Sequence, residues 1–551
     1  MGSLQHLPGE GPIILHRKLG LHERYSVTRY NIGAPPILAY GARLTSRSSD
    51  TAQVVHAHIA RRVEVALKSL PLLSCFVEGA KTRQPRFASR GEIAVEDVLL
   101  PLRKERIDAA VATSSSRPTL ERLIEEAVDQ PLQELLDLTS APLWRVQVIE
   151  EGPEIFVLLT VGHVICDGRG AGNLLELLFE GLDTTSDSHD SAATASSAID
   201  RLTVPPSSDR LVIPSLRYAL GVAFQELVVP RLPSGLGSWF QASPAWPAAN
   251  AAGRTEEKLL IPPLKASKRV KLLSFPHGTI AALKAIGRTN GVMTVHPILS
   301  TVCTVATYAM AMSNKVSNID DGYSSSVRIS SETAINIRGL MKDAREHTEC
   351  TGNFAAALHW EAEVAPNDNF WDMARSYAAR VASDSDRQKA RYAVGVLSYL
   401  PDPATHVPPS EKIPTAWESW LHDKAMSDRP HSASFVLSNL GKISIPVRAG
   451  VKEVAWNARA QPTAGLMEVD VSGLELQGGQ QGDEATAPAC DLSMCVGWSH
   501  GVLSEDDSRE YLFVDTMRRC IDLLAATGAA SRQQLTVGDL LDSLGVGAGT
   551  L

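Results

Sequence analysis

Length, composition and charge already narrow the possibilities for this 551-residue chain. Apolar residues make up 44% and charged residues 21%, which is typical of a soluble globular protein, and the length predicts two or more domains. A net charge of −9 gives no support for a nucleic-acid partner, since such proteins usually carry a basic patch. Seven scattered cysteines argue against a disulfide framework and for a reducing, cytoplasmic location.

The sequence predicts alternating helices and strands in the first third of the chain. We expect a helical start and then a strand over 12–45, and a helix over 51–70, where apolar residues recur at helical spacing. Apolar runs then predict strands over 71–79, 141–150 and 154–165, the last of them buried, and a helix over 170–182.

The chain then passes through a Ser/Ala/Thr-rich segment, 183–201, which we interpret as a linker. We expect an N-terminal lobe over 1–200, an irregular linker and lid over 201–256, and a C-terminal lobe over 257–551, part of which could pack back on the first lobe. In the linker, 216–229 forms a helix candidate whose apolar face could contact a membrane or the entrance of a substrate site, although a packed or lid helix is the more common explanation of such a face.

Two long helices are predicted in the C-terminal lobe. Residues 289–314 lack any Asp, Glu, Lys or Arg and are long enough to span a bilayer. Interspersed serines and threonines favour a buried core helix instead, so we expect no transmembrane span. The final helix covers 508–526. Cys490 and Cys495 are close in sequence, but no second ligand pair lies at zinc spacing, so no metal site is predicted.

The stretch LLTVGHVICDGRGAGNLLELL, residues 158–178, allows two interpretations. A dinucleotide-binding loop needs G-x-G-x-x-G after a strand, whereas Gly168, Gly170 and Gly172 are spaced G-x-G-x-G. Asp167 would also face the pyrophosphate with the wrong charge. The pattern therefore argues against nucleotide binding.

The alternative interpretation concerns the histidine of the same stretch. Among the fifteen histidines, only His163 is followed by an aspartate four residues later, Asp167. A histidine near an apolar strand is more often structural than catalytic. On a glycine-rich turn at the end of a buried strand, however, it would be held rigidly, as a general base requires.

The sequence GHVICDGRG resembles the H-x-x-x-D-G motif of the coenzyme-A-dependent acyltransferase superfamily, which includes chloramphenicol acetyltransferase, plant alcohol acyltransferases and condensation domains. The segments SAPLWRVQVIE, INIRGL, CTGNFAAAL and FVLSNLGKISIP occur in the order found in that superfamily. The start RKLGLHERYSVTRYNIG and the Ser-Asn-Leu-Gly sequence are most similar to the fungal alcohol acetyltransferase family.

This resemblance implies an α/β fold of two pseudo-symmetric lobes with a channel between them. Acyl-CoA, most simply acetyl-CoA, would enter from one face and a small alcohol acceptor from the other, and they would meet at His163 as general base. The resemblance implies no covalent acyl-enzyme and no permanently bound cofactor, and a monomer is expected. Asp167 would pair with Arg338 of NIRG and fix the turn, although Arg338 could equally be a surface residue.

Four further residues receive roles from the resemblance. Ser438 or Asn439 would donate a hydrogen bond to the tetrahedral oxyanion, although either could be an ordinary turn residue. Gly168 would permit an unusual backbone angle or a close approach at the substrate site. Asn353 of TGNF resembles a residue that lines the channel.

Two departures from the superfamily bear on the function. The plant Asp-Phe-Gly-Trp-Gly motif is replaced by CVGWSHG, and Gly162 stands where condensation domains usually carry a second histidine. Without a carrier domain, a CoA thioester is favoured as the donor. A carrier-bound donor (for release, condensation or cyclisation) and a non-catalytic binding protein remain the alternatives. We expect a cytoplasmic protein, with peripheral contact to an endomembrane allowed.

Overall fold

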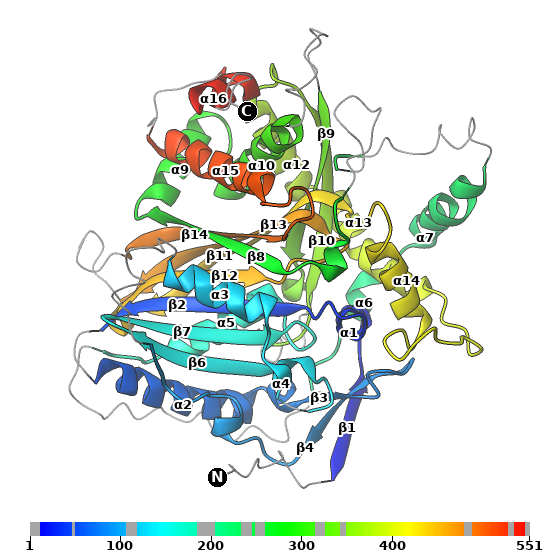
Figure 1. Cartoon of the computed structure of the whole chain (residues 1–551), viewed down its shortest axis with the longest axis vertical. Coiled ribbons are helices and arrows are strands. Elements are labelled where there is room, and N and C mark those ends of the chain that lie inside the picture. Colours follow the sequence, from blue (N-terminus) through cyan, green and yellow to red (C-terminus); the bar gives the residue numbers. More distant parts are fainter. Residues whose placement is uncertain are drawn as a thin grey trace.

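A computed structural model of the chain describes residues 12–46, 50–105, 118–140, 142–184, 204–232, 245–247, 259–313, 326–341, 349–478, 488–526 and 534–545. The predicted linker from residue 185 onward and most of 233–258 lie outside these residues. The structure is mixed α/β with two lobes, as the sequence predicts. Figure 1 shows the first lobe, blue to cyan, below the second, which runs from green to red.

The first lobe is built on a five-stranded sheet with the order β12-β2-β7-β6-β5. Its strands are β2 (Ile37–Thr45), β5 (Arg103–Glu105), β6 (Trp144–Glu151), β7 (Glu154–Gly162) and β12 (Val451–Ala458). Helices α2 (Thr51–Ser69) and α5 (Gly168–Phe179) share one hydrophobic core with this sheet. Helix α3 (Thr119–Asp129) packs on the opposite face. β7 is almost continuously apolar because both of its faces are covered.

Strand β12 comes from the C-terminal half of the chain but belongs to the sheet of the first lobe. It pairs antiparallel with β2, which places Trp456 opposite Tyr40. The two rings stack with their centroids 5.3 Å apart. The strand therefore links the second lobe to the first by a ladder of backbone hydrogen bonds, with one irregularity between Val451 and Glu453.

A small antiparallel sheet begins the described chain. It consists of β1 (Ile13–Lys18), β4 (Arg86–Arg90) and β3 (Phe76–Glu78). The sequence predicted a helical start and then a strand over 12–45. Helix α1 (Leu21–Asn31) and strand β2 confirm this order, but strand β1 precedes them and was not predicted. β1 is largely exposed, so it lacked the buried apolar pattern from which strands are recognised.

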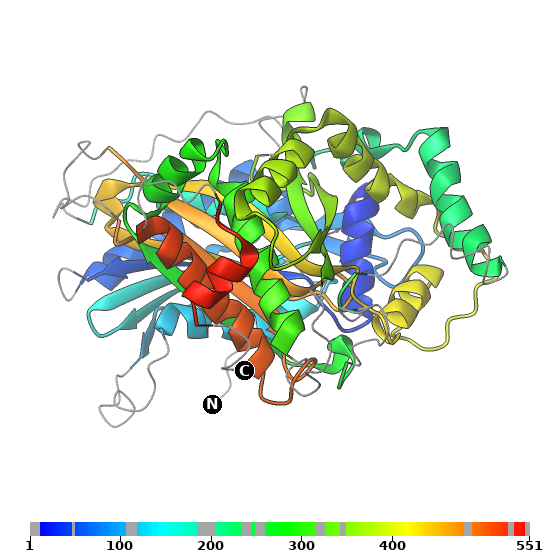
Figure 2. The ribbon, with the colours of Figure 1, turned by 90° about the horizontal axis from the view of Figure 1, so that it is seen from above.

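The second lobe contains a six-stranded sheet with the order β10-β9-β11-β13-β14-β8. Its strands are β8 (Lys268–Pro276), β9 (Val327–Asn336), β10 (Ala355–Val364), β11 (Ala433–Pro446), β13 (Gly465–Gln477) and β14 (Cys490–Ser499). One face is covered by α9 (Thr279–Thr289), α10 (Val295–Met312), α12 (Phe370–Ala382) and α15 (Ser508–Ala526), which Figure 2 shows from above.

Helix α10 is the uncharged segment of the sequence. By length and apolar composition it is the one helix of the described residues that could cross a membrane, and 83% of that stretch is buried inside the protein. It packs among α9, α12 and α15 in the core of the second lobe.

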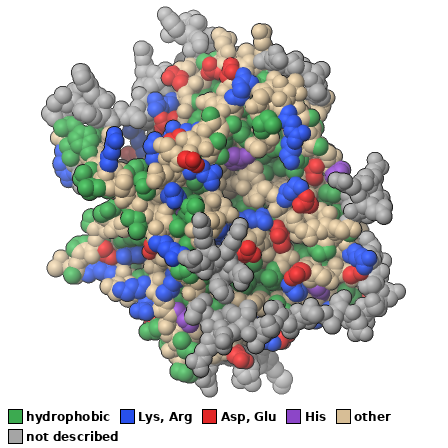
Figure 3. All heavy atoms as spheres, turned by 180° about the vertical axis from the view of Figure 1, so that it is seen from behind, with side chains coloured by type: hydrophobic (Ala, Val, Ile, Leu, Met, Phe, Trp, Pro, Cys, Tyr) green, Lys and Arg blue, Asp and Glu red, His purple; other side chains and the backbone are tan. Residues whose placement is uncertain are grey.

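The remaining helices lie around the edges of the two lobes. They are α4 (Gln133–Leu136), α6 (Asp209–Val212), α7 (Leu216–Ala223), α13 (Asp384–Gly395), α14 (Ala416–Ala425) and α16 (Val537–Ser543). α7 projects from the body and buries no residue; Leu216 and Leu220 are 74% and 61% exposed. Figure 3 shows the hydrophobic side chains of this projection, at the left.

Candidate active site

His163 follows the last residue of β7, on a turn where the two lobes meet. Its backbone N–H donates to the carbonyl of Pro36 at 2.8 Å, which continues the pairing of β7 with β2. From the second lobe, Asn353 Nδ2 donates to the carbonyls of His163 at 2.9 Å and Val164 at 3.2 Å. The backbone that carries the histidine is therefore held from both lobes.

Asn353 was expected to line a channel, and the structure gives it a different place. The residue is 4% exposed, and its amide is used by the two carbonyls of the histidine turn. It is thus a positioning residue for the turn rather than a substrate contact.

The imidazole of His163 is half-buried and presents one nitrogen for chemistry. Nδ1 is enclosed and forms no hydrogen bond to another described residue, so Nε2 is the ring nitrogen that remains accessible. Burial lowers the pKa of His163 below its ordinary value. Asp167 and the residue's own backbone oppose this shift, whereas Arg29 and His22 add to it. The ring is therefore neutral near pH 7, the state in which it can accept a proton.

We expect the acid side of the kcat/KM–pH profile to reach half-maximum below pH ~6.5, because the protonated ring cannot act as a base and its pKa is lowered. A second group titrates in the same pH range, since burial raises the pKa of Glu468 to about 7, and this carboxyl group faces Arg29, which acts on the pKa of His163. The profile should therefore be measured in the wild type and in Glu468→Gln. If the acid-side midpoint of the Glu468→Gln profile stayed at or above pH ~6.5, the profile would not report the titration of His163.

Asp167 is a buried carboxylate directly after the turn, and it accepts hydrogen bonds from several groups. It caps α5 by accepting from the Gly170 N–H at 2.9 Å, and it accepts from the Phe354 N–H at 2.7 Å. Arg338 Nη1 lies 2.6 Å and 2.7 Å from the two carboxylate oxygens. Asp167 is 2% and Arg338 7% exposed. Burial alone would raise the pKa of Asp167, but Arg338 and the two N–H groups outweigh it, so the pKa lies below its ordinary value.

The structure thus brings Arg338, from the second lobe, to the place that the resemblance implied. Arg338 Nη2 also donates to the carbonyl of Gly352 at 3.1 Å, and the guanidinium lies over the Phe354 ring, 5.3 Å from its centroid. Because every oxygen of Asp167 is already bonded, this carboxylate is placed to hold the turn and not to take up a substrate proton.

Gly168, the first residue of α5, supports a close approach between the lobes. Its φ is not positive, so an unusual backbone angle is not the reason for glycine here. A Cβ at this position would lie 3.2 Å from the Trp456 ring and 3.3 Å from Leu440. The glycine lets α5 pack against β11 and β12, so a close approach is the reason for glycine at this position.

Ser438 and Asn439 lie on opposite faces of the second sheet, because successive side chains of a strand alternate. Ser438 is opposite Asp470 on the neighbouring strand, and its hydroxyl counteracts in part the rise that burial causes in the pKa of that carboxyl group. Asp470 in turn accepts from Asn457 Nδ2 at 3.0 Å, so this face looks toward β12 and the first lobe.

Asn439 lies on the face that carries α10. Its Oδ1 accepts from the Gly441 N–H at 2.8 Å in an irregularity of β11, and its Nδ2 lies 3.5 Å from His296 Nδ1. Of the two oxyanion candidates, Ser438 is therefore the one that faces β12 and the first lobe, whereas Asn439 faces α10.

Helix α1 supplies residues near His163 that the sequence analysis did not single out. A Cβ at Gly162 would lie 2.6 Å from the Tyr30 hydroxyl, so a tyrosine fills the space that a side chain at position 162 would need. Arg29, the preceding residue, is 4% exposed. The signal available in the sequence was the resemblance of RYNIG to a family segment, which carried no chemical role.

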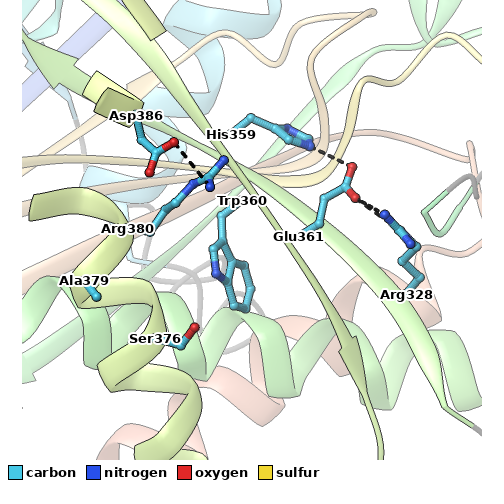
Figure 4. A pocket seen from close by; sticks show the side chains of 8 residues that line it. All are labelled: Arg328, His359, Trp360, Glu361, Ser376, Ala379, Arg380 and Asp386. Atoms are coloured by element: carbon cyan, nitrogen blue, oxygen red, sulfur yellow. Dashed lines mark hydrogen bonds and ion pairs between the residues drawn. The ribbon is translucent and has the colours of Figure 1, made fainter. Parts of the chain in front are cut away.

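A surface pocket lies away from this site, between β10 and helices α12 and α13 (Figure 4). Its charged side chains neutralise one another: Arg328 pairs with Glu361, which also accepts from His359 at 2.9 Å. Arg380 pairs with Asp386 at 3.3 Å. None of the residues that line this pocket is among those described around His163. Among the described residues, no group of three or more His, Cys, Asp or Glu could hold a metal ion.

Comparisons with known proteins agree with the fold. No protein-family model matches the chain, and no curated protein matches it. Among solved structures, the trichothecene 15-O-acetyltransferase TRI3 of Fusarium sporotrichioides matches with a TM-score of 0.55 and 11% identity, over 95% of this chain and 99% of that one. The chain has an acetyltransferase and condensation-domain fold.

Two further structures support that statement. The first condensation domain of the calcium-dependent antibiotic synthetase matches with a TM-score of 0.53 and 14% identity, over 96% of this chain and 99% of that one. TRI101 of F. graminearum, in complex with ethyl coenzyme A, matches with a TM-score of 0.50 and 11% identity, over 89% and 96%. At these identities the likeness concerns the fold, so the chemistry must be argued from the residues.

Proposed function

We propose that this protein is an O-acyltransferase that moves an acyl group, acetyl in the simplest case, from a CoA thioester to the hydroxyl of a small alcohol or natural product. The observation that carries the proposal is a neutral histidine with Nε2 available, on a turn held by Asn353 and by the Asp167–Arg338 pair. Two structures with this fold are named as an O-acetyltransferase and as a complex with ethyl coenzyme A, which supports this choice of donor.

In the proposed reaction, His163 Nε2 accepts the proton of the acceptor hydroxyl while its oxygen attacks the thioester carbonyl. The tetrahedral intermediate collapses, the carbon–sulfur bond breaks, and the imidazolium returns the proton to the departing thiolate. Base catalysis of this kind contributes about 10²–10⁴-fold, and holding both substrates between the lobes contributes the larger entropic part. Ser438 is proposed to donate its one hydroxyl proton to the oxyanion.

A donor bound to a carrier protein is the second candidate, favoured by the fold it shares with condensation domains. One local feature distinguishes the two. Position 162, where the resemblance led us to expect the second histidine of condensation domains, is a glycine packed against the Tyr30 hydroxyl. We take this replacement as support for the CoA thioester.

The purified protein is expected to release free thiol from acetyl-CoA only when a suitable alcohol is present, because the base needs an acceptor proton to remove. A thiol-reactive dye and a panel of alcohols measure this, and the ester product is identified by mass. Inactivity with every acyl-CoA, together with turnover of a loaded carrier protein, would favour the second candidate.

A further inference from the structure

Arg29 is a buried cation that forms no ion pair within the described part of the chain. The residue is 4% exposed, and its Nε and Nη2 have no hydrogen bond to any described residue. A guanidinium stays protonated in proteins, and leaving its N–H groups unbonded in a buried place is costly. Such groups are normally satisfied by protein, water or ligand, so an unbonded arginine inside a folded chain calls for a functional reason.

The place of Arg29 is beside the proposed base. On the same helix, Ser26 Oγ donates to the carbonyl of His163 at 3.5 Å, and the Tyr30 hydroxyl packs on Gly162. The charge of Arg29 also disfavours protonation of His163. A group that bonds to Arg29 would therefore lie close to the reacting atoms.

The surroundings of Arg29 carry an excess of positive charge. Arg459 and Lys268 face the same region, and in the described part of the chain neither they nor Arg29 form an ion pair with a carboxylate. Arg459 and Lys268 donate instead to backbone carbonyls and to a serine hydroxyl. Arg459 Nε is enclosed and unbonded as well.

Two carboxyl groups oppose these cations only in part. Glu468 is the one that faces Arg29, and burial raises its pKa to about 7, so it is only partly charged near neutrality. Asp129 faces Arg459 and Lys268, and Glu468 faces Lys268 as well. Burial lowers the pKa of Lys268 to about 7, so this cation is also only partly charged near neutrality, and the excess of positive charge comes from Arg29 and Arg459. An anion is the missing element of this buried group.

We infer that the substrate brought to His163 carries a carboxylate, on its acyl group or on its acceptor, and that Arg29 binds this carboxylate. The inference rests on the proposed function and names the class of substrate. A planar guanidinium matches a carboxylate with two parallel hydrogen bonds. The phosphates of CoA are separated from its thioester by the pantetheine arm, so they are not the anion expected beside the base.

The test uses two pairs of substrates that differ in one carboxylate. Succinyl-CoA is compared with butyryl-CoA as donor, and 4-hydroxybutanoate with 1-butanol as acceptor of acetyl-CoA. In the wild type, kcat/KM for the carboxylate member of one pair should be higher by about 10- to 100-fold, the value of hydrogen bonds to a charged group. The pair that responds identifies which substrate carries the anion.

Arg29→Met should abolish this preference while the melting temperature stays unchanged or rises, because it removes an unbonded buried charge. Arg29→Lys should retain part of the preference. Arg24→Met is the matched control on the same helix: Arg24 pairs with Asp402 and lies over Trp417, so its loss should leave the preference intact. Free succinate should raise the melting temperature of the wild type and not of Arg29→Met.

Three results would overturn the inference. One is transfer by the wild type with no preference in either pair and no response to succinate. Another is a preference that survives in both Arg29 variants. The third is a higher KM of Arg29→Met for acetyl-CoA but not for acetyl-pantetheine, which would assign Arg29 to the CoA phosphates. A different result would contradict the proposed acyltransferase activity. In that case the protein would consume no acyl-CoA, even if succinate raised its melting temperature.

Discussion

Replacing His163 with alanine is expected to lower the rate of acyl transfer by at least ~10²-fold. The variant loses the imidazole that is proposed to accept the hydroxyl proton, and base catalysis of this kind contributes about 10²–10⁴-fold. The rate is measured as thiol release at saturating acetyl-CoA and alcohol. Mass spectrometry should show no acylated protein in either form, since the proposed reaction has no covalent intermediate.

The fold of His163→Ala should persist, because the ring is half-buried and the turn is held through backbone carbonyls by Asn353. Circular dichroism, the melting temperature and calorimetric binding of CoA serve as controls and should match the wild type. Turnover within a few-fold of the wild type would remove His163 from the mechanism and leave only the fold in place.

The second large effect is expected from Asp167→Asn, which should reduce stability and activity together. The substitution leaves the Arg338 guanidinium in a buried place without its counter-charge and weakens the bonds to Gly170 and Phe354. Breaking a buried ion pair in this way costs about 3–5 kcal/mol. Chemical denaturation measures the loss, and thiol release measures the activity.

A double-mutant cycle with Arg338→Met tests whether the two residues act as a pair. Removing both charges should cost less than the sum of the single changes, because no charge is left unpaired. Asp515→Asn is the matched control at an exposed pair, Arg519–Asp515, where about 0–1 kcal/mol is expected. If Asp167→Asn kept its stability and lost only turnover, Asp167 would have to act on the substrate directly.

Several elements follow from local sequence patterns, because the physics behind them is local. The apolar run of β7 predicts a strand buried on both faces, and the spacing of 508–526 predicts a helix that the structure reproduces in full as α15. The change from an apolar run to a glycine-rich turn also predicts that His163 and Asp167 follow the end of this strand, as they do. The uncharged segment was expected to be a core helix and is one.

Other features were decided only when distant segments came together. The pairing of β12 with β2 and the opposite faces of Ser438 and Asn439 depend on the register between strands far apart in the chain, which no local pattern specifies. The burial of Arg29 also depends on distant segments. The local sequence predicts an exposed arginine on a short polar helix, but α1 packs against the turn that carries His163 and buries the side chain. Periodicity reports which face of an element is apolar, whereas the environment of a buried charge is set by every segment that surrounds it.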